Sequence, residues 1–430
     1  MENNSNRRLL FAIGFVLFFA IIVILWYFFY AKPVIAPSLT ETRDPFPIQK
    51  SPPRFQFLTW GQEDTSTSTT EITDPLLLPL VQVWDKPATG QAFITQDILK
   101  EIIATSTVGT SSTLVKKTIR ATSTVLIFVD RTTGYVYGFP LLTGKPFQIS
   151  NTLIPGVYDA YFYEKGTRVI MRYVDQEKNE IVGVIAEVPN VQENEMALPL
   201  KNVQYIHSNI TSIASNFKKE KVSYVVTTDS GSDFYTLTKN GTSRITSSPF
   251  REWNLSYGGE GLHVTTKPSA YSEGSTFSVP QFQSEVTEKT GLMSNPSPEN
   301  LIFNSMWGQD GLVSFITRNG NLKLAAFKTL ASKCSWGEKK FLVCAIPREI
   351  PRTTEGLPDD WFQGRFMFND DFFVVDSVTG EPYSLYVFKK EDGLFDVTNI
   401  SISEENKYLG FNKKQDASLW LLNLDLIKDE

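Results

Sequence analysis

Histidine and cysteine are almost absent from this chain of 430 residues, which contains two of each. Two histidines leave little material for an imidazole metal site or for a histidine base in catalysis. His207 and His263 both lie in apolar runs and are expected to be ordinary strand residues. An excess of basic charge is lacking too, because 41 Lys and Arg stand against 47 Asp and Glu, for a net charge of -6. A nucleic-acid partner is therefore not expected.

The motifs of common enzyme classes are also missing. The chain has no Gly-x-Ser-x-Gly nucleophile turn and no Gly-x-x-x-x-Gly-Lys-Ser/Thr phosphate loop. Apolar residues make up 41% of the sequence and charged residues 20%, which is the balance of a folded chain. We expect no catalytic residue, no cofactor and no metal ligand.

One long uncharged apolar run is present, at residues 9–30. Its 22 residues would form a helix of about 33 Å, enough to cross a bilayer core of about 30 Å. Arg7 and Arg8 precede it, which favours a cytoplasmic position for residues 1–8. A cleaved signal peptide is the alternative, although the apolar part of such peptides is normally about 7–15 residues long. We predict an uncleaved, single-pass signal anchor with all later residues outside the cytoplasm.

The composition changes after this run. Six prolines between residues 33 and 53 favour an extended, fairly stiff chain, so we predict a Pro/Ser/Thr-rich stalk at residues 31–75. Residues 76–430 are expected to fold. A Thr/Ser-rich insertion near residues 104–124 is expected to form solvated loops within that part.

A short pattern recurs from residue 125 onward: an apolar strand, a turn, and a second strand with alternating apolar residues. A period of about 40–50 residues with several strands per unit is typical of β-propeller blades. We predict an all-β propeller of about seven blades, with six or eight blades or two separate domains as alternatives. The first strands of the seven units begin at residues 125, 169, 222, 262, 312, 372 and 408.

Turns and closure give two further expectations. The sequence Asp-x-x-Thr-Gly occurs at residues 130–134 and 376–380, and we place both turns at the same position of the repeat. Asp accepts backbone N–H groups there, and Gly supplies positive φ. The last unit lacks an outer strand, whereas an unassigned strand lies upstream at Leu80–Trp84, with residues 92–94 as a possible partner. We predict that this N-terminal strand completes the last blade and closes the ring.

Residues 400–411 and 418–424, ISISEENKYLGF and SLWLLNL, resemble a blade of the TolB-type and WD-repeat-like propellers. Those families usually have Pro-Asp-Gly where this chain has Glu-Glu-Asn at residues 404–406. Segments 128–134, 150–155 and 357–364 are similar to membrane-anchored propeller-like proteins of candidate-phylum bacteria. The resemblance covers most of the chain after about residue 80. It implies a propeller at a bacterial cytoplasmic membrane and no particular activity.

Cys334 and Cys344 are the only cysteines. Outside the cytoplasm an even cysteine count predicts a disulfide, here across a turn that Trp336 and Gly337 could begin. Two unpaired buried thiols are the alternative. A zinc site is not expected, because two cysteines without a nearby histidine cannot fill a tetrahedral shell.

Acidic and aromatic residues gather between residues 359 and 376. The carboxylates could form an acid–base pair or a Ca²⁺ site, but turn residues and solvated blade edges are the simpler interpretation. Two neighbouring rings could form an exposed platform for a partner or fill the space between blades. The carboxylates are Asp359, Asp360, Asp370, Asp371 and Asp376, and the candidate partner-binding set is Asp359, Asp360, Trp361 and Phe362.

Every blade of a propeller contributes loops to a shared surface, which suits a rigid platform for contacts. We therefore predict a non-enzymatic scaffold that binds a protein partner in the cell envelope. The alternative is a carbohydrate-active or cell-wall-binding protein that uses acidic and aromatic loop residues. A sensor that signals through the anchor is a third possibility, disfavoured by a cytoplasmic tail of only eight residues.

Overall fold

A computed structural model describes residues 78–108, 111–216, 221–238, 241–259, 261–309, 311–337, 341–350 and 356–427. The predicted anchor at 9–30 and the predicted stalk at 31–75 lie outside these ranges. Within them, no helix is both long and apolar enough to span a bilayer.

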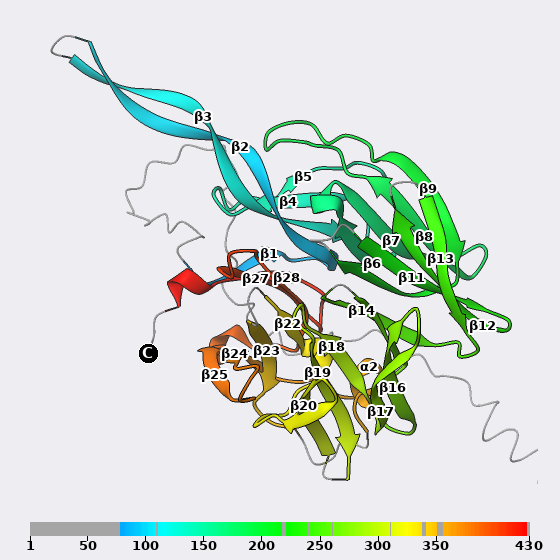
Figure 1. Cartoon of the computed structure of the whole chain (residues 1–430). Coiled ribbons are helices and arrows are strands. Elements are labelled where there is room, and N and C mark those ends of the chain that lie inside the picture. The colour runs from blue at the N-terminus through cyan, green and yellow to red at the C-terminus, as the bar shows by residue number, and fades with distance from the viewer. Residues whose placement is uncertain are drawn as a thin grey trace, which may run out of the picture. The chain divides into compact units, whose positions relative to one another are not determined.

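Seven antiparallel sheets of four strands each form the blades of a β-propeller in this part of the chain (Figure 1). The predicted all-β, seven-bladed fold is confirmed. Blade 1 holds β2 (Ala88–Val108), β3 (Ser111–Asp130), β4 (Val136–Pro140) and β5 (Phe147–Gln148). Blade 2 holds β6 (Val157–Tyr163), β7 (Arg168–Asp175), β8 (Glu180–Glu187) and β9 (Lys201–Ser208). Blade 3 holds β10 (Ile210–Asn216), β11 (Lys221–Thr228), β12 (Gly231–Thr238) and β13 (Gly241–Ser248).

The remaining blades repeat this order, from the inner strand outward. Blade 4 holds β14 (Trp253–Gly258), β15 (Gly261–Thr266), β16 (Glu273–Val279) and β17 (Gln283–Thr290). Blade 5 holds β18 (Met293–Pro296), β19 (Leu301–Gly308), β20 (Gly311–Arg318) and β21 (Asn321–Leu324). Blade 6 holds β22 (Cys334–Trp336), β23 (Leu342–Pro347), β24 (Asp370–Val375) and β25 (Pro382–Tyr386). Blade 7 holds β26 (Val397–Ile402), β27 (Tyr408–Lys413), β28 (Leu419–Asn423) and β1 (Leu80–Trp84).

The N-terminal strand β1 is the outermost strand of the last blade, as predicted. It pairs with β28 in antiparallel register, with Leu80 opposite Leu422 and Val81 opposite Leu421. Residues 92–94, the predicted partner of β1, belong instead to β2 and pair with β3, so that part of the prediction is wrong. The two ends of the propeller domain thus share one sheet.

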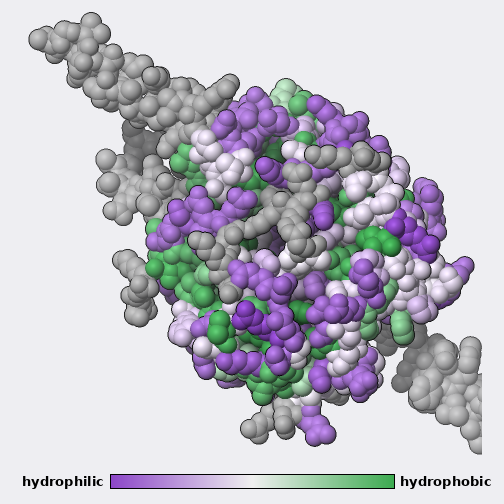
Figure 2. Space-filling view, viewed as in Figure 1, coloured by the Kyte–Doolittle hydropathy of each residue, from purple (hydrophilic) through white to green (hydrophobic). Residues whose placement is uncertain are grey.

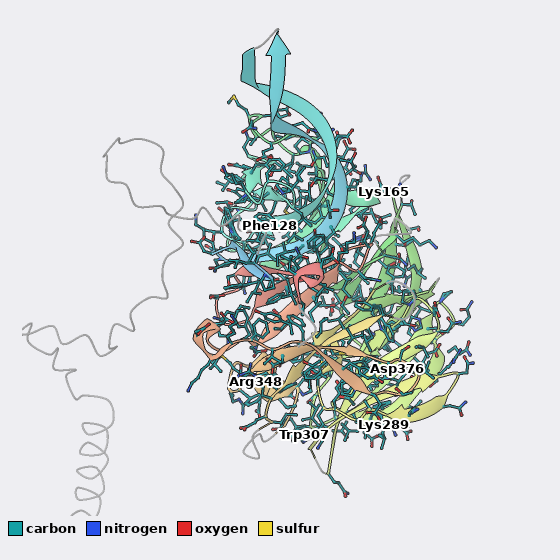
Figure 3. All side chains as sticks on the ribbon, turned by 90° about the vertical axis from the view of Figure 1, so that its left-hand side faces the viewer. Phe128, Lys165, Lys289, Trp307, Arg348 and Asp376 are labelled. Carbon is teal, nitrogen blue, oxygen red and sulfur yellow. A yellow bond between two sulfur atoms is a disulfide. The ribbon has the colours of Figure 1, made fainter. Side chains whose placement is uncertain are left out.

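Among the described residues, buried apolar side chains form seven clusters, and each lies between two adjacent blades. The cluster between blades 7 and 1 includes Val83, Phe128 and Leu419, so the ring is closed by packing as well as by β1. Figure 3 shows Phe128 among the packed side chains below the projecting β2–β3 hairpin. A four-stranded sheet cannot cover its own two faces, and stacking around the ring covers both.

Burial therefore depends on the position of a strand within its blade. All six residues of β23, a second strand, are buried, whereas all four residues of β21, an outer strand, are exposed. Second strands read as continuous apolar runs because a neighbouring blade covers each face. Outer strands such as β13, GTSRITSS, read as polar segments.

Three sequence predictions need correction. The units starting at 312 and 372 are the third and fourth strands of blades 5 and 6, because their second strands are β19 and β23. The turn at 130–134 joins a second to a third strand, but that at 376–380 joins a third to a fourth, so the two do not occupy the same position. The Thr/Ser-rich stretch near 104–124 lies mostly in β2 and β3 rather than in loops, since the hairpin pairs from Ala88 opposite Asp130 to Val108 opposite Ser111.

Helices are short in the described part. The inner strands all start at one face of the ring, which we call the helix face because α2 (Asp359–Phe362) and the 3-10 turn η3 (Ala331–Lys333) lie there. They end at the opposite face, which we call the arm face. The other 3-10 turns are η2 (Glu164–Gly166), η4 (Lys390–Asp392) and η5 (Leu424–Leu426).

Candidate functional site

The predicted partner-binding set forms α2, in the loop between β23 and β24. Trp361 is 4% exposed and Asp360 5% exposed, so the interpretation of Trp361 and Phe362 as an exposed aromatic platform is wrong for Trp361. Trp361 fills space within the cluster between blades 5 and 6, which was the other interpretation. Asp359 accepts a hydrogen bond from the backbone N of Ala270 at 2.5 Å. Phe362 alone of the four presents a large exposed surface, 53% of its area.

The neighbouring carboxylates are engaged separately. Asp370 Oδ2 lies 2.6 Å from Lys333 Nζ, and Asp371 receives two hydrogen bonds from Arg348, at 2.7 and 2.8 Å. Asp376 accepts two backbone N–H groups of its own turn, which lowers the pKa of its carboxyl. Within the described ranges no group of three or more His, Cys, Asp or Glu side chains is placed to hold a metal ion.

The predicted disulfide is confirmed. Cys334 and Cys344 are directly opposite each other on β22 and β23 and are bonded through their sulfur atoms. The bond lies at the start of the inner strand of blade 6, directly after Lys333. It therefore fixes the chain at the helix face.

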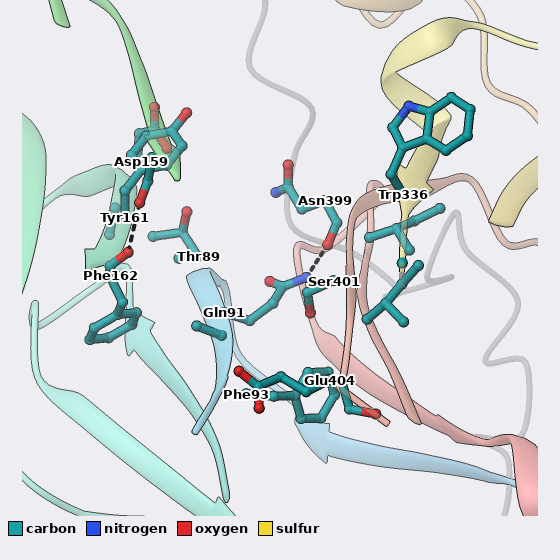
Figure 4. A pocket seen from close by; sticks show the side chains of 18 residues that line it. Thr89, Gln91, Phe93, Asp159, Tyr161, Phe162, Trp336, Asn399, Ser401 and Glu404 are labelled. Carbon is teal, nitrogen blue, oxygen red and sulfur yellow. Dashed lines mark hydrogen bonds between the residues drawn. The ribbon is translucent and has the colours of Figure 1, made fainter. Parts of the chain in front are cut away.

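A cavity of about 360 Å³ lies where the inner strands end, toward the arm face (Figure 4). It is lined by parts of β2, β6, β10, β22 and β26, so it lies on the axis of the ring. Gln91 donates a hydrogen bond from Nε2 to the backbone O of Asn399 across it, linking blades 1 and 7. The polar side chains of its wall include those of Thr89, Gln91, Ser215, Asn399, Ser401 and Glu404.

Two carboxylates line this pocket, and that of Asp159 is already in an ion pair. Asp159 forms an ion pair with Arg172, whose Nη1 also donates to the backbone O of Ile210 at 3.1 Å. Burial, aided by the charge of Asp159, raises the pKa of Tyr161 well above its usual range. Asp159 therefore stabilises the junction of blades 2 and 3. The other carboxylate, Glu404, is exposed.

The β2–β3 hairpin continues far beyond the sheet of blade 1. Strand β3 pairs with β4 only from Val125 to Val129, and the hairpin pairing runs on to Val108 opposite Ser111. No other strand of the described part pairs with residues 98–108 and 111–121, which we call the arm. At about 3.3 Å per residue, the 11 residues of each arm strand reach about 35 Å. In Figure 1 the hairpin projects away from the ring.

The root of the arm is held in place beside the pocket. Gln96 Nε2 donates to Asn190 Oδ1 at 3.0 Å and to the backbone O of Val191 at 3.1 Å, so it is tied to blade 2. Across the hairpin, Thr122 Oγ1 donates to Asp97 Oδ1 at 3.0 Å. The arm thus starts from β2, a strand that also lines the pocket.

The arm differs in charge from the rest of the chain. Residues 98–121 contain four basic residues and one acidic residue, a charge of +3 in a chain whose net charge is -6. Hydrophilic residues dominate the ring surface in the view of Figure 2, and hydrophobic ones occur in small separate groups. A net positive charge and unpaired strand edges therefore distinguish the arm.

The sequence analysis predicted loops where the structure has the two strands of the arm. Thr and Ser content near 104–124 suggested a loop, although β-branched residues also favour strands. The available signal was the composition of residues 102–108, IIATSTV, in which five of the seven residues are β-branched.

No family model and no curated protein matches this chain. Solved structures similar to it include a protein assigned as TolB from Agrobacterium tumefaciens, with 13% identity, a TM-score of 0.32 and coverage of 46% of this chain and 76% of that one. The β-propeller domain of Cps50 (Swd1) from Myceliophthora thermophila has 8% identity and a TM-score of 0.41, over 70% of this chain and 93% of that one. The propeller domain of the Trilobed protease of Pyrococcus furiosus has 10% identity and a TM-score of 0.44, over 76% and 95%. At such values no activity is transferred to this chain.

Proposed function

We propose that this protein is a non-enzymatic binding platform, anchored in the bacterial cytoplasmic membrane by residues 9–30, whose extracytoplasmic propeller holds a protein partner at the arm face. The observation that carries the proposal is the arm itself, whose strands continue after their pairing with the ring has ended. The uncharged run of 22 residues supports the anchor.

The arm suits a partner with an acidic surface. Each arm strand has one edge whose backbone N–H and C=O groups are unpaired with any described strand, and such edges bind extended segments by strand addition. The charge of +3 would steer an acidic partner toward these edges. The pocket at the arm root would receive a side chain of the same partner.

The test uses the full chain in its own membranes, with a photo-cross-linking residue at Thr105 in the arm. A matched control carries the cross-linker at Leu322, an exposed residue of the outer strand β21. We expect one defined adduct from Thr105 and not from Leu322. Replacement of the four basic arm residues by Gln should weaken that adduct. Identical adducts from both positions, or none from Thr105, would contradict the proposal.

A cell-wall-binding or carbohydrate-active protein is the second candidate, favoured by the exposed Glu404 in the pocket. It predicts that isolated cell wall retains the full chain and that Glu404→Gln abolishes retention. Glu405→Gln, at the exposed neighbouring position, is the matched control. Retention lost through Glu404→Gln but unaffected by neutralisation of the arm would replace the first proposal by the second.

A further inference from the structure

Lys333 is a fully buried lysine at the helix face, with 0% of its side chain exposed. Its Nζ lies 2.6 Å from Asp370 Oδ2, 2.6 Å from Asp396 Oδ1 and 2.8 Å from the backbone O of Val397. Both carboxylates are also 0% exposed. One amine and two carboxyl groups therefore meet in a site removed from solvent.

Aromatic rings form the walls of this site. Lys333 Nζ is 5.2 Å from the ring centre of Trp361 and 4.9 Å from that of Phe368. Ions in such surroundings lose their hydration, and the attraction between them offsets that loss only in part. A reaction that removes an ion pair and releases water is favoured there more than in bulk solvent.

The two carboxyl groups are held differently. Asp396 accepts hydrogen bonds from Lys333, from Trp361 Nε1 at 2.9 and 3.1 Å, and from the backbone N of Phe368 at 3.1 Å. Asp370 uses only Oδ2, which accepts from Lys333 and from a backbone N–H, while its Oδ1 has no partner in the described part. Burial raises the pKa of Asp370 to about 6, although Lys333 opposes the shift. The raised pKa favours the neutral, electrophilic form of the Asp370 carboxyl group.

We propose that Lys333 Nζ and Asp370 Cγ form an isopeptide bond within the folded chain, with Asp396 as the proton acceptor. Asp396 takes a proton from the Lys333 ammonium, and the free amine attacks Cγ of protonated Asp370. The amine then loses a second proton, the hydroxyl group of Asp370 leaves as water, and an amide remains. The four protons of the starting ammonium, acid and carboxylate end as one on the amide, two on water and one on Asp396. No external reagent is needed, and the cluster stays neutral.

The fold brings the reacting groups together before any bond forms. Lys333 directly precedes the disulfide-bonded Cys334 at the start of β22, and Asp370 is the first residue of β24. These strands are separated by β23 in the sheet of blade 6. The bond would join them at the helix face, across the loop that carries α2. Preorganised reacting groups of this kind gain much of the rate of an intramolecular reaction.

Intact-protein mass spectrometry of the full chain, after reduction of the disulfide, tests the proposal. The expected mass is lower than the sequence mass by one water. Trypsin should release a branched peptide that joins residues 329–339 to residues 366–389. The variants Lys333→Met and Asp370→Ala should each have the full mass calculated from their own sequences, with no loss of water. Asp371→Asn is the matched control and should keep the loss of water, because Asp371 binds Arg348 instead.

Asp396→Asn tests the proton acceptor, since it retains both reacting residues. We expect its mass to equal the calculated mass of that variant, with its disulfide formed. Loss of water in Asp396→Asn would remove Asp396 from the reaction. A folded wild-type chain with the full sequence mass, or a branch at Asp396 in place of Asp370, would overturn the proposal.

Discussion

The two faces of the propeller differ in how they hold their polar groups. At the helix face, between blades 6 and 7, Lys333, Asp370 and Asp396 are all inaccessible, and Lys333 Nζ donates to both carboxylates. At the arm face, hydroxyl, amide and carboxylate groups line an open pocket, and a hairpin extends past its sheet. Buried charges fix one geometry because leaving one of them unpaired is costly. Unpaired strand edges remain available to other chains.

The contrast assigns rigidity and recognition to different ends of the same strands. The long loop between β23 and β24 adds Trp361 to the helix face, where it packs between blades and also donates to Asp396. The insertion in blade 1 adds length to two strands at the arm face instead. The loop between β23 and β24 therefore adds a buried side chain to the core, whereas the insertion in blade 1 extends the chain beyond the ring. Four predictions test this division.

The largest effect is expected at Trp361. Trp361→Ala should lower the free energy of unfolding by about 3–5 kcal/mol, because it leaves a cavity and removes a donor from a buried carboxylate. Phe362→Ala, one residue further on, should change it by less than about 0.5 kcal/mol, because Phe362 is 53% exposed. Guanidinium denaturation of both variants measures the difference. Equal losses would mean that the helix face is not the rigid end.

The disulfide should have the second-largest effect on the free energy of unfolding. Its loop spans 10 residues, and in the chain-entropy account closing a loop of that size stabilises by about 2–4 kcal/mol. The double variant Cys334→Ala with Cys344→Ala should unfold at correspondingly lower denaturant. Reduction of the wild type under native conditions is the control for the effect of the substitutions themselves. No change on reduction, with the thiols shown to be free, would contradict a stabilising role at this face.

Much of the ring could be predicted because second strands are covered on both sides. Apolar runs such as residues 169–174 and 222–226 stand out for that reason. Outer strands such as β21 and β13 are largely exposed, so their composition resembles that of loops. In blades 5 and 6 the predicted hairpins nevertheless began one strand too late, because the third strands β20 and β24 are also largely buried and resemble second strands. Closure by β1 could still be inferred, because the last unit ended without an outer strand.

Site residues were predicted less well, for a related reason. The turns at 130–134 and 376–380 have the same local chemistry, since both Asp130 and Asp376 accept two backbone N–H groups. Turn sequence fixes a turn but not its position in a blade. Likewise, nothing near Lys333 in the sequence indicates Asp396, which comes from the next blade. The disulfide was predicted from the cysteine count and the predicted extracytoplasmic position, and the bond is confirmed.

The faces should also differ in their response to pH. His263 lies two residues from the arm-face start of β15, and burial lowers its pKa, with Glu285 opposing the shift. The folded state therefore favours the neutral ring. The stabilisation of the folded state that comes from neutral His263 is present above the unfolded pKa of about 6.5, and it is lost as pH falls below that value. His263→Gln should flatten this part of the stability profile, by less than the effect of the disulfide.

His207→Gln is the matched control, since the chain has only these two histidines. Its Nδ1 lies 2.8 Å from Tyr224 Oη, whereas Nδ1 of His263 has no partner in the described residues. Comparing each variant with the wild type at the same pH cancels the contribution of Asp370. A fall in stability on acidification that persists in His263→Gln would assign the response to other groups.

The smallest effect on stability is expected where the effect on binding is expected to be greatest. Replacing residues 98–121 by Asn-Gly would join Asp97 to Thr122, which already face each other, through a tight hairpin turn. Because the arm pairs with no other described strand, the free energy of unfolding should change by less than about 0.5 kcal/mol. The same variant should lose the cross-linked partner of the full chain. A large loss of stability would show that the arm packs on the ring and would place it with the rigid part of the molecule.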